Sequence, residues 1–310
     1  MKTRKWRFGI PLNVISFIYN DNASRTDFII DKGYPQAVDE IVRFLKAQSG
    51  WDAIELPSVW LESGTFKLTV EALKRHGCRH SIKDGLHSPV IMLGPDWDTY
   101  FKKRSKRFRH HLRNTLNRIN RAKTDLRCVK HISERPDTIQ QICGISEKSW
   151  KARSKNHLDS RGNDSVFFDE LTRSLADQGW LSLWMLDIDA RPAAYDYHVL
   201  YNGNIYALRS DYDERYAMYS PGTFIHMTVI RKYIEENKGL RKYEFCGHEE
   251  EYKTKWTSEI KFHGNITIYR SSFCGALLYA MDYKVAYKCK QLLKKFAILK
   301  RLKKLVTRTR

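Results

Sequence analysis

Four consecutive residues have the types expected where a helix begins and binds an anion: Ser220, Pro221, Gly222 and Thr223. Serine favours the N-cap position, and proline fits the first helical position because its missing N–H would be unpaired there in any case. Apolar residues follow at helical spacing up to Gly239. The free N–H groups of the first turn and the positive end of the helix dipole would then suit a diphosphate.

A group of titratable side chains follows a short predicted strand at 241–246, which contains Glu244. Tyr252 and Lys253 come beyond the carboxyl end of this strand, and Asp211 follows another predicted strand at 204–210. Polar side chains that titrate are therefore expected to gather just beyond strand ends, close to the predicted anion site.

The elements that position these residues follow from periodicity and turn signals. Asn202-Gly203 is typical of a hairpin turn between two strands. Two helices, a three-strand meander, a helix and a strand predict an α+β fold with a mixed sheet flanked by helices. We expect strands at 12–19, 52–56, 89–93, 180–188, 193–201, 204–210, 241–246 and 265–270, and helices at 35–48, 65–76, 102–123, 137–150, 164–178 and 221–238.

The chain is long enough for two medium domains, each with its own core. The junction is expected near 133–137, where Pro136 precedes a helix start. This gives an N-terminal lobe at 1–134 ending in a basic helix, a second lobe at 135–273, and a basic tail at 274–310.

Six cysteines without a Cys-x-x-Cys pair favour reduced thiols in a cytosolic protein. The sequence 76–80 contains two histidines and a cysteine, but no second cluster completes a tetrahedral site, so we expect no metal. The apolar run 10–18 is broken by Pro11 and Asn13, which indicates a strand and not a signal peptide. No stretch approaches the roughly twenty apolar residues of a membrane span, which predicts a soluble body.

The formal net charge is +20, and two runs without acidic residues carry much of it. The first, 102–123, has apolar residues at helical spacing and predicts an amphipathic helix, whose basic face is either simply solvated or a track for phosphate. The second follows Asp282 and again predicts a basic amphipathic helix. Such a helix is expected to lie on an anionic membrane surface, with nucleic acid or an acidic partner protein as alternatives.

These residues also carry a resemblance. The meander, the helix after Asp211, and the run 243–247 followed by Tyr252, Lys253 and Trp256 resemble the GNAT superfamily, and within it the acyltransferases of the CelD-like type, named after a cellulose-biosynthesis member. The resemblance covers most of residues 10–270. In the first half, the places that the family uses are occupied by Asn20, Ser24 to Asp27, Trp51-Asp52, Glu55-Leu56 and the basic segment 107–118.

A more distant similarity links the chain to the Fem-type peptidyltransferases, which pair two GNAT-like halves. It implies two tandem GNAT-like lobes here, the first degenerate and the second an acyltransferase. Glu244 stands where the CelD-like family has an aspartate, and the tail lies outside the resemblance.

The resemblance implies acetyl-CoA or another acyl-CoA as co-substrate, with its diphosphate at Gly222 and Thr223. The acceptor that it implies is an amine or hydroxyl of a sugar, on a glycan or polysaccharide precursor. Glu244, Asp211 and Asp213 are then candidate bases, Tyr252 a proton donor to the leaving thiolate, and Lys253 a stabiliser of charge or a phosphate ligand.

Structural interpretations of the same residues stay open. Glu244 would be a salt-bridged strand residue, Tyr252 a packing partner of Trp256, and Asp211 and Asp213 turn formers. His198 lies among core residues on a predicted strand, which favours a structural role. Trp150 and Trp184 are expected in the core more than in the wall of an acceptor site.

Two other classes of function remain. A Fem-type enzyme would take an aminoacyl group from charged tRNA, which the basic helix and tail would suit because phosphate contacts dominate nucleic-acid affinity. A non-enzymatic module would bind nucleic acid or membrane, but it would have no use for the helix start at 220–223. We therefore expect a cytoplasmic acyl-CoA-dependent acyltransferase, peripheral at the inner face of the membrane.

Overall fold

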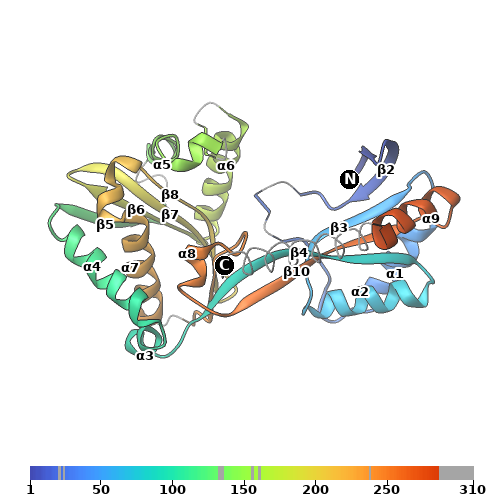
Figure 1. Ribbon diagram of the computed structural model, residues 1–310, viewed down its shortest axis with the longest axis horizontal. Helices are drawn as coiled ribbons and strands as arrows, with labels where there is room; N and C mark the ends of the chain where they lie inside the picture. Colours follow the sequence, from blue (N-terminus) through green and yellow to red (C-terminus); the bar gives the residue numbers. More distant parts are fainter. Residues whose placement is uncertain are drawn as a thin grey trace, which may run out of the picture. The chain divides into compact units, whose positions relative to one another are not determined.

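The computed structural model describes residues 1–19, 22–23, 25–131, 136–154, 157–159, 162–236 and 239–285. The chain forms two compact units (Figure 1). The first comprises Met1–Leu86 and Phe262–Arg310, and the second comprises His87–Lys261. The long strand β4 (Arg79–Met92) and the strand β10 (Ile260–Tyr269) each run across a boundary between these segments.

The first unit is built on the strand order β1-β2-β3-β10-β4. β1 and β2 form an antiparallel hairpin, β2 runs parallel to β3, and β3 pairs antiparallel with β10. Helices α1 and α2 pack together, and their apolar residues share a core with β3 and β10. Besides β4 and β10, the elements of this unit are β1 (Lys2–Arg7), β2 (Ile10–Ser16), β3 (Ala53–Trp60), α1 (Ala37–Ala47), α2 (Gly64–Arg75), α9 (Phe273–Tyr279) and the π-helix η4 (Ala280–Val285).

Two local features explain how β4, β10 and the last described helix fit this unit. A Cβ atom at Gly85 would stand 2.8 Å from the carbonyl oxygen of His263, so glycine permits the close approach of β4 to β10. The buried carboxylate of Asp282 pairs with Arg7 and Lys83, each at 2.9 Å, and accepts a hydrogen bond from Tyr269 at 3.0 Å. The helix η4 is thereby anchored to the sheet.

The second unit has the strand order β9-β8-β7-β6-β5, with the last residues of β4 beside β9. β5 to β8 are antiparallel, whereas β8 and β9 are parallel. Figure 1 shows α4 and α7 on one face of this sheet and α5 and α6 on the other, and each face has its own apolar core. The strands are β5 (Thr124–Val129), β6 (Leu181–Ile188), β7 (Arg191–Tyr201), β8 (Asn204–Tyr212) and β9 (Lys242–Glu244). The helices are α3 (Trp97–Lys102), α4 (Lys106–Ile119), α5 (Thr138–Ser146), α6 (Asn163–Asp177), α7 (Pro221–Glu236), α8 (Glu251–Thr254) and the 3-10 helices η2 (Trp150–Ser154) and η3 (Glu214–Tyr219).

The α+β class with a mixed sheet and flanking helices, predicted from the sequence, is confirmed. The turn at Asn202-Gly203 is also as predicted, since both residues have positive φ, 49° and 69°. The prediction of one continuous basic helix at 102–123 is wrong. Ser105 caps a new helix by accepting a hydrogen bond from the amide of Phe108, which separates α3 from α4.

The division into units differs from the predicted domains 1–134, 135–273 and 274–310. The second unit begins at His87, so α4 and its basic side chains lie within it and not at the end of the first lobe. The predicted junction at 133–137 lies mostly outside the described residues, as does most of the predicted basic tail. Among the described residues, no helix is long and apolar enough to span a bilayer.

Candidate active site

A cavity of about 310 Å³ lies in the second unit where two parallel strands part. The ladder between β8 and β9 runs only from Asn204 opposite Lys242 to Tyr206 opposite Glu244. β8 then continues to Tyr212, whereas the chain after β9 turns through Cys246 and Gly247, which both have positive φ. The cavity is lined by Phe108, His111, Trp150, Lys151, Ser210, Asp211, Tyr212, Gly222, Thr223, His226, Glu250, Tyr252, Lys255 and Trp256.

The start of α7 forms one wall of this cavity. Pro221 is the first residue of the helix, as predicted, and Gly222 and Thr223 line the cavity. Ser220 has left-handed backbone angles, and its hydroxyl accepts a hydrogen bond of 3.0 Å from Arg118 of α4. The predicted anion site therefore has the cation of Arg118 next to the helix start, which adds to the favourable potential for a phosphate.

His226, one turn further along α7, also lines the cavity. Its Nδ1 atom lies 3.2 Å from Oδ2 of Asp196, a fully buried residue of β7. The other oxygen of Asp196 lies 3.0 Å from Nε2 of His198. These are ion-pair distances, and neither oxygen of Asp196 accepts a hydrogen bond of regular geometry from the described residues.

Burial and charge set the protonation states of this group. Burial opposes the ionisation of Asp196, but the neighbouring imidazoles of His198 and His226 bring its pKa below the ordinary value. Burial lowers the pKa of His226, and the attraction of Asp196 opposes this shift. An ionised carboxylate beside a neutral imidazole is thus the favoured state near neutral pH.

Behind Asp196, polar side chains continue into the core. Nδ1 of His198 lies 3.0 Å from the hydroxyl of Tyr233, and Nε2 lies 3.0 Å from the hydroxyl of Tyr243. The Tyr233 hydroxyl also contacts Ser182 at 2.8 Å and accepts a hydrogen bond from Trp184 at 3.1 Å. His198 and Trp184 are therefore core residues, as predicted, but they belong to a network that ends at the cavity.

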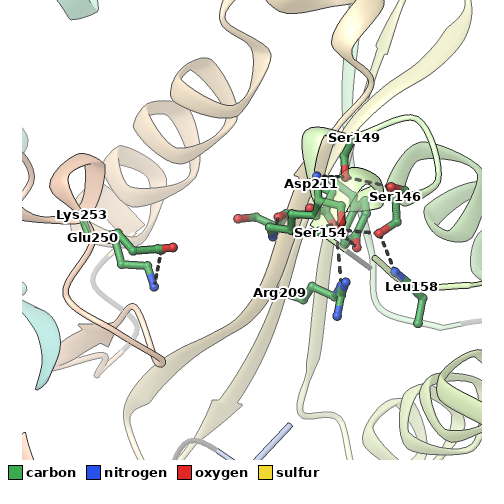
Figure 2. Close-up of polar contacts among 11 residues, drawn as sticks. Ser146, Ser149, Ser154, Leu158, Arg209, Asp211, Glu250 and Lys253 are labelled. Atoms are coloured by element: carbon green, nitrogen blue, oxygen red, sulfur yellow. Dashed lines mark hydrogen bonds and ion pairs between the residues drawn. The ribbon is translucent and has the colours of Figure 1, made fainter. Parts of the chain in front are cut away.

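Asp211, a predicted catalytic residue, lines the cavity at the end of β8, where neighbouring side chains contact both of its oxygens (Figure 2). Its Oδ2 atom accepts hydrogen bonds of 2.8 Å from both Ser146 and Tyr195 and one of 3.3 Å from Arg209. Oδ1 lies 2.8 Å from Nζ of Lys151. This arrangement favours a structural role for Asp211, and its role as a base stays a prediction.

Tyr252 and Lys253 follow the turn after β9. Tyr252 lines the cavity with 43% of the residue exposed, yet desolvation around its hydroxyl raises its pKa well above the ordinary value, so it stays protonated. Lys253 is buried, and its ammonium donates to the carbonyl oxygens of Cys246 at 3.0 Å and His248 at 3.1 Å. It also pairs with Glu250 at 3.0 Å, as Figure 2 shows. Lys253 therefore holds this loop in shape.

Glu244 is not among the described residues that line the cavity. Its buried carboxylate pairs with Lys242 at 3.1 Å and with Lys261. Asp213 accepts hydrogen bonds from the backbone and guanidinium of Arg215 and caps η3, which is the turn-forming role that the sequence allowed. Among the described residues, no group of three or more histidine, cysteine, aspartate or glutamate side chains is placed to hold a metal ion.

Sequence reasoning missed His226, Asp196 and Lys151. The signal for His226 was its position four residues after Gly222, which places His226 and Gly222 on one face of the predicted helix. Asp196 and His198 alternate on one face of a strand, and a carboxylate and an imidazole at successive inward positions are unusual for a buried strand. Trp150 was expected in the core, but it lines the cavity and is partly exposed.

Comparison with known proteins agrees with this geometry. The family model for the acetyltransferase (GNAT) domain matches residues 106–254, from the start of α4 to the end of α8. All the cavity-lining residues except Lys255 and Trp256 fall within this match. The matched segment, residues 106–254, is therefore a GNAT-type acetyltransferase domain, and it supplies most of the cavity lining. The finer CelD-like type stays a prediction.

Three solved structures have the same fold over most of their length. FemX is 14% identical, with a TM-score of 0.61 over 90% of this chain and 85% of that chain. The C-terminal DUF2156 domain of a putative lysylphosphatidylglycerol synthetase from Agrobacterium fabrum is 13% identical, with a TM-score of 0.54 over 92% of this chain and 88% of that chain. L-PGS from Bacillus licheniformis is 11% identical, with a TM-score of 0.53 over 91% and 88%. No curated protein is significantly similar in sequence.

Proposed function

We propose that the protein transfers an acyl group from an acyl-CoA, most simply acetyl-CoA, to an amine or hydroxyl in the cavity of the second unit. One observation carries the proposal: the cavity of a GNAT-type domain opens between diverging strands and has the start of α7 as one wall. A donor with a diphosphate and an amide-bearing arm matches these two features.

The diphosphate would bind the first-turn amides of α7 at Gly222 and Thr223, with Arg118 adding a positive charge. The pantetheine arm would extend β8, because the ladder to β9 ends at Tyr206. Backbone groups of β8 between that residue and Tyr212 would pair with the amides of the arm. The thioester would thereby reach the part of the cavity near Tyr252.

The acceptor that we propose is a sugar amine or hydroxyl on a glycan or polysaccharide precursor, as the CelD-like resemblance implies. The aromatic side chains of Trp150, Tyr212 and Trp256 give the cavity flat apolar walls of the kind on which a sugar ring can stack. Lys151 and Glu250 supply polar groups of both charges at its edge.

The proposal is tested by donor binding and donor consumption. Coenzyme A and acetyl-CoA should raise the melting temperature, since a ligand that binds only the folded state stabilises it. Thiol release from acetyl-CoA should then rise with one member of a panel of amino sugars, polysaccharides and simple amines. No binding and no thiol release with any acceptor would refute acyl-CoA as the donor.

A second candidate is transfer of an aminoacyl group from tRNA. It is supported by the shared fold with FemX, with the domain of a putative lysylphosphatidylglycerol synthetase and with L-PGS. The exposed cationic residues of α4, Lys106, Arg107 and Arg113, also support it. Bulk tRNA should then stabilise the protein more than coenzyme A does. Binding should weaken steeply with salt, because counterions are released from each neutralised phosphate.

A further inference from the structure

Two histidines face one buried carboxylate in the second unit, and one of these histidines reaches the cavity. Nδ1 of His226 lies 3.2 Å from Asp196, which leaves Nε2 as the nitrogen available to a bound acceptor. We propose that His226 is the general base of the acyl transfer and that Asp196 is a positioning residue that fixes its imidazole. This inference rests on the proposed function of the cavity.

The ring of His226 is held on its other sides by aromatic side chains. It stacks on Phe245 with ring centres 5.9 Å apart, and it lies 6.3 Å from the ring of Trp256 and 6.2 Å from that of Tyr252. His226 is 5% exposed. A base held in one orientation and shielded from bulk water is the arrangement that general base catalysis requires.

The close contacts of Asp196 with the two histidines indicate that its carboxylate is buried in order to act on them. Within the described residues its ion-pair partners are His226 and His198, and none is a lysine or arginine. An ionised carboxylate without a permanent cation is costly in a core. At 3.2 Å from Nδ1 of His226, its negative charge favours the tautomer that carries the proton on Nδ1 and leaves the lone pair on Nε2.

The second histidine holds the carboxylate in place. His198 contacts the hydroxyls of Tyr233 and Tyr243, each at 3.0 Å, so its ring is fixed by the core. Asp196 therefore lies between His198 in the core and His226 at the cavity. Among the described residues, the main charged or titratable groups around His226 are Asp196 and His198 of β7, Lys253 and Tyr252 of α8, and Lys151 of η2.

The two carboxylates predicted as bases are less suited to the task. Asp211 accepts three hydrogen bonds and forms an ion pair with Lys151. Glu244 pairs with two lysines and does not line the cavity. Both carboxylates are therefore already occupied by side chains of the protein. Burial keeps His226 neutral at neutral pH, so it can accept a proton without first losing one.

The step balances with these groups alone. The acceptor nitrogen or oxygen attacks the acyl carbon while its proton passes to Nε2 of His226, and a tetrahedral adduct forms. The adduct collapses as the carbon–sulfur bond breaks, and the leaving thiolate takes a proton from the hydroxyl of Tyr252. His226 returns its proton, through solvent, to Tyr252. The products are the acylated acceptor and free coenzyme A.

The first test is kinetic. His226→Gln should lower kcat by about 100-fold or more, the usual contribution of a general base, while KM for acetyl-CoA changes less than about threefold. The matched control is His76→Gln, because His76 also faces a carboxylate, Asp39 at 3.0 Å, but in the first unit. Its activity should equal that of the wild type. An active wild type with unchanged turnover in His226→Gln would overturn the base assignment while leaving the proposed function intact.

Asp196→Asn tests the positioning role. Removing the carboxylate removes the attraction that raises the pKa of His226, so the acidic limb of the kcat/KM profile should move to lower pH and kcat should fall about tenfold. A purely structural Asp196 would leave the limb in place. If this variant does not fold, His226→Ala with added imidazole replaces it, and rescue of turnover by imidazole is expected. Absence of rescue would count against the base.

A readout without activity separates the two proposals. In protein with nitrogen-15 histidine, the signals lost in His226→Gln identify His226, and its Nε2 should be unprotonated at pH 7. A wild type that consumes neither acetyl-CoA nor aminoacyl-tRNA would refute the proposed function. Protonated Nε2 at pH 7 would overturn the inference about His226, whatever the donor.

Discussion

Nζ of Lys151 lies 2.8 Å from Oδ1 of Asp211 and donates a hydrogen bond of 2.7 Å to the carbonyl oxygen of Ser210. This pair fastens the 3-10 helix η2 to the end of β8. The opposite oxygen of Asp211 accepts from Ser146, whose hydroxyl in turn accepts a 2.8 Å hydrogen bond from the amide of Leu158 (Figure 2). One buried carboxylate therefore joins β8 to three segments beside the cavity.

Replacing Asp211 by Asn should lower the free energy of unfolding by about 3 kcal/mol, because Lys151 and Arg209 would lose the charge that compensates their partial burial. Midpoints of urea denaturation measure this change. Asp39→Asn is the matched control, since its carboxylate pairs with Arg75 at the surface and such pairs contribute little. An Asp211→Asn variant as stable as the wild type would contradict the structural role.

Gly222→Glu should weaken binding of coenzyme A at least tenfold, about 1.4 kcal/mol, because its carboxylate would repel the diphosphate at the start of α7. The fold should tolerate the change, since a Cβ atom at Gly222 would meet only Tyr212, at 3.6 Å. Gly222→Gln has the same size without the charge and should lose less affinity. Equal affinities of both variants and the wild type, measured by calorimetry, would remove the diphosphate from this helix start.

Tyr252→Phe should lower kcat more than it raises KM for acetyl-CoA. The reason is that the lost hydroxyl would give its proton to sulfur only in the transition state, and desolvation keeps that hydroxyl protonated. Initial rates over a range of acetyl-CoA concentrations separate the two parameters. A variant with normal kcat would leave Tyr252 as a wall of the cavity and nothing more.

Glu244→Gln should destabilise the protein by about 3 kcal/mol at pH 7, because Lys242 and Lys261 would lose their shared carboxylate. Burial lowers the pKa of Lys261 to about 8, against the attraction of Glu244. A folded-state pKa below the unfolded value of roughly 10.4 means that stability rises with pH between the two values and is lost as pH falls.

Without the carboxylate, the pKa of Lys261 should fall further, so in Glu244→Gln the rise should begin at a lower pH than in the wild type. Denaturation midpoints at pH 7, 8, 9 and 10 measure it. Lys261→Met is the control that removes this source of pH dependence. Glu244→Gln also tests Glu244 as a base. Loss of the acidic limb of its pH–rate profile would favour Glu244 over His226 as the base.

Features fixed by a few neighbouring residues could be predicted from the sequence. Asn202-Gly203 specifies its hairpin because both residues accept positive φ, and Pro221 marks the first residue of α7. The first half of β4 could not be predicted, since residues 79–86 alternate without a clear apolar face and depend on pairing with a strand far along the chain. Intrinsic preference is weak where the partner strand decides.

The same distinction holds for the candidate site. Gly222, Thr223, Asp211 and Tyr252 line the cavity because each lies at an element end that the local pattern marks. The pairing of His226 with Asp196 joins a helix to the middle of a strand, and no local pattern reports which residue of β7 faces which residue of α7. The environment of Glu244 is set by Lys261 on β10, equally far in sequence.

The basic segment after Asp282 gives the last prediction. It carries eleven lysines and arginines and no acid, and most of it lies beyond the described residues. A truncation after Val285 keeps Asp282, whose carboxylate pairs with Arg7 and Lys83, so the first unit should remain folded.

The full-length protein should co-sediment with anionic vesicles at low salt, because each cationic side chain near such a surface contributes about 1 kcal/mol, and it should be released as salt screens the attraction. The truncated protein should not co-sediment, yet it should consume acetyl-CoA with a soluble acceptor at the wild-type rate, since the cavity lies wholly in the second unit. Neutral vesicles are the control. Retention of tRNA by the full-length chain, together with indifference to anionic vesicles, would contradict a membrane role for the tail. It would then place transfer from aminoacyl-tRNA ahead of transfer from acyl-CoA.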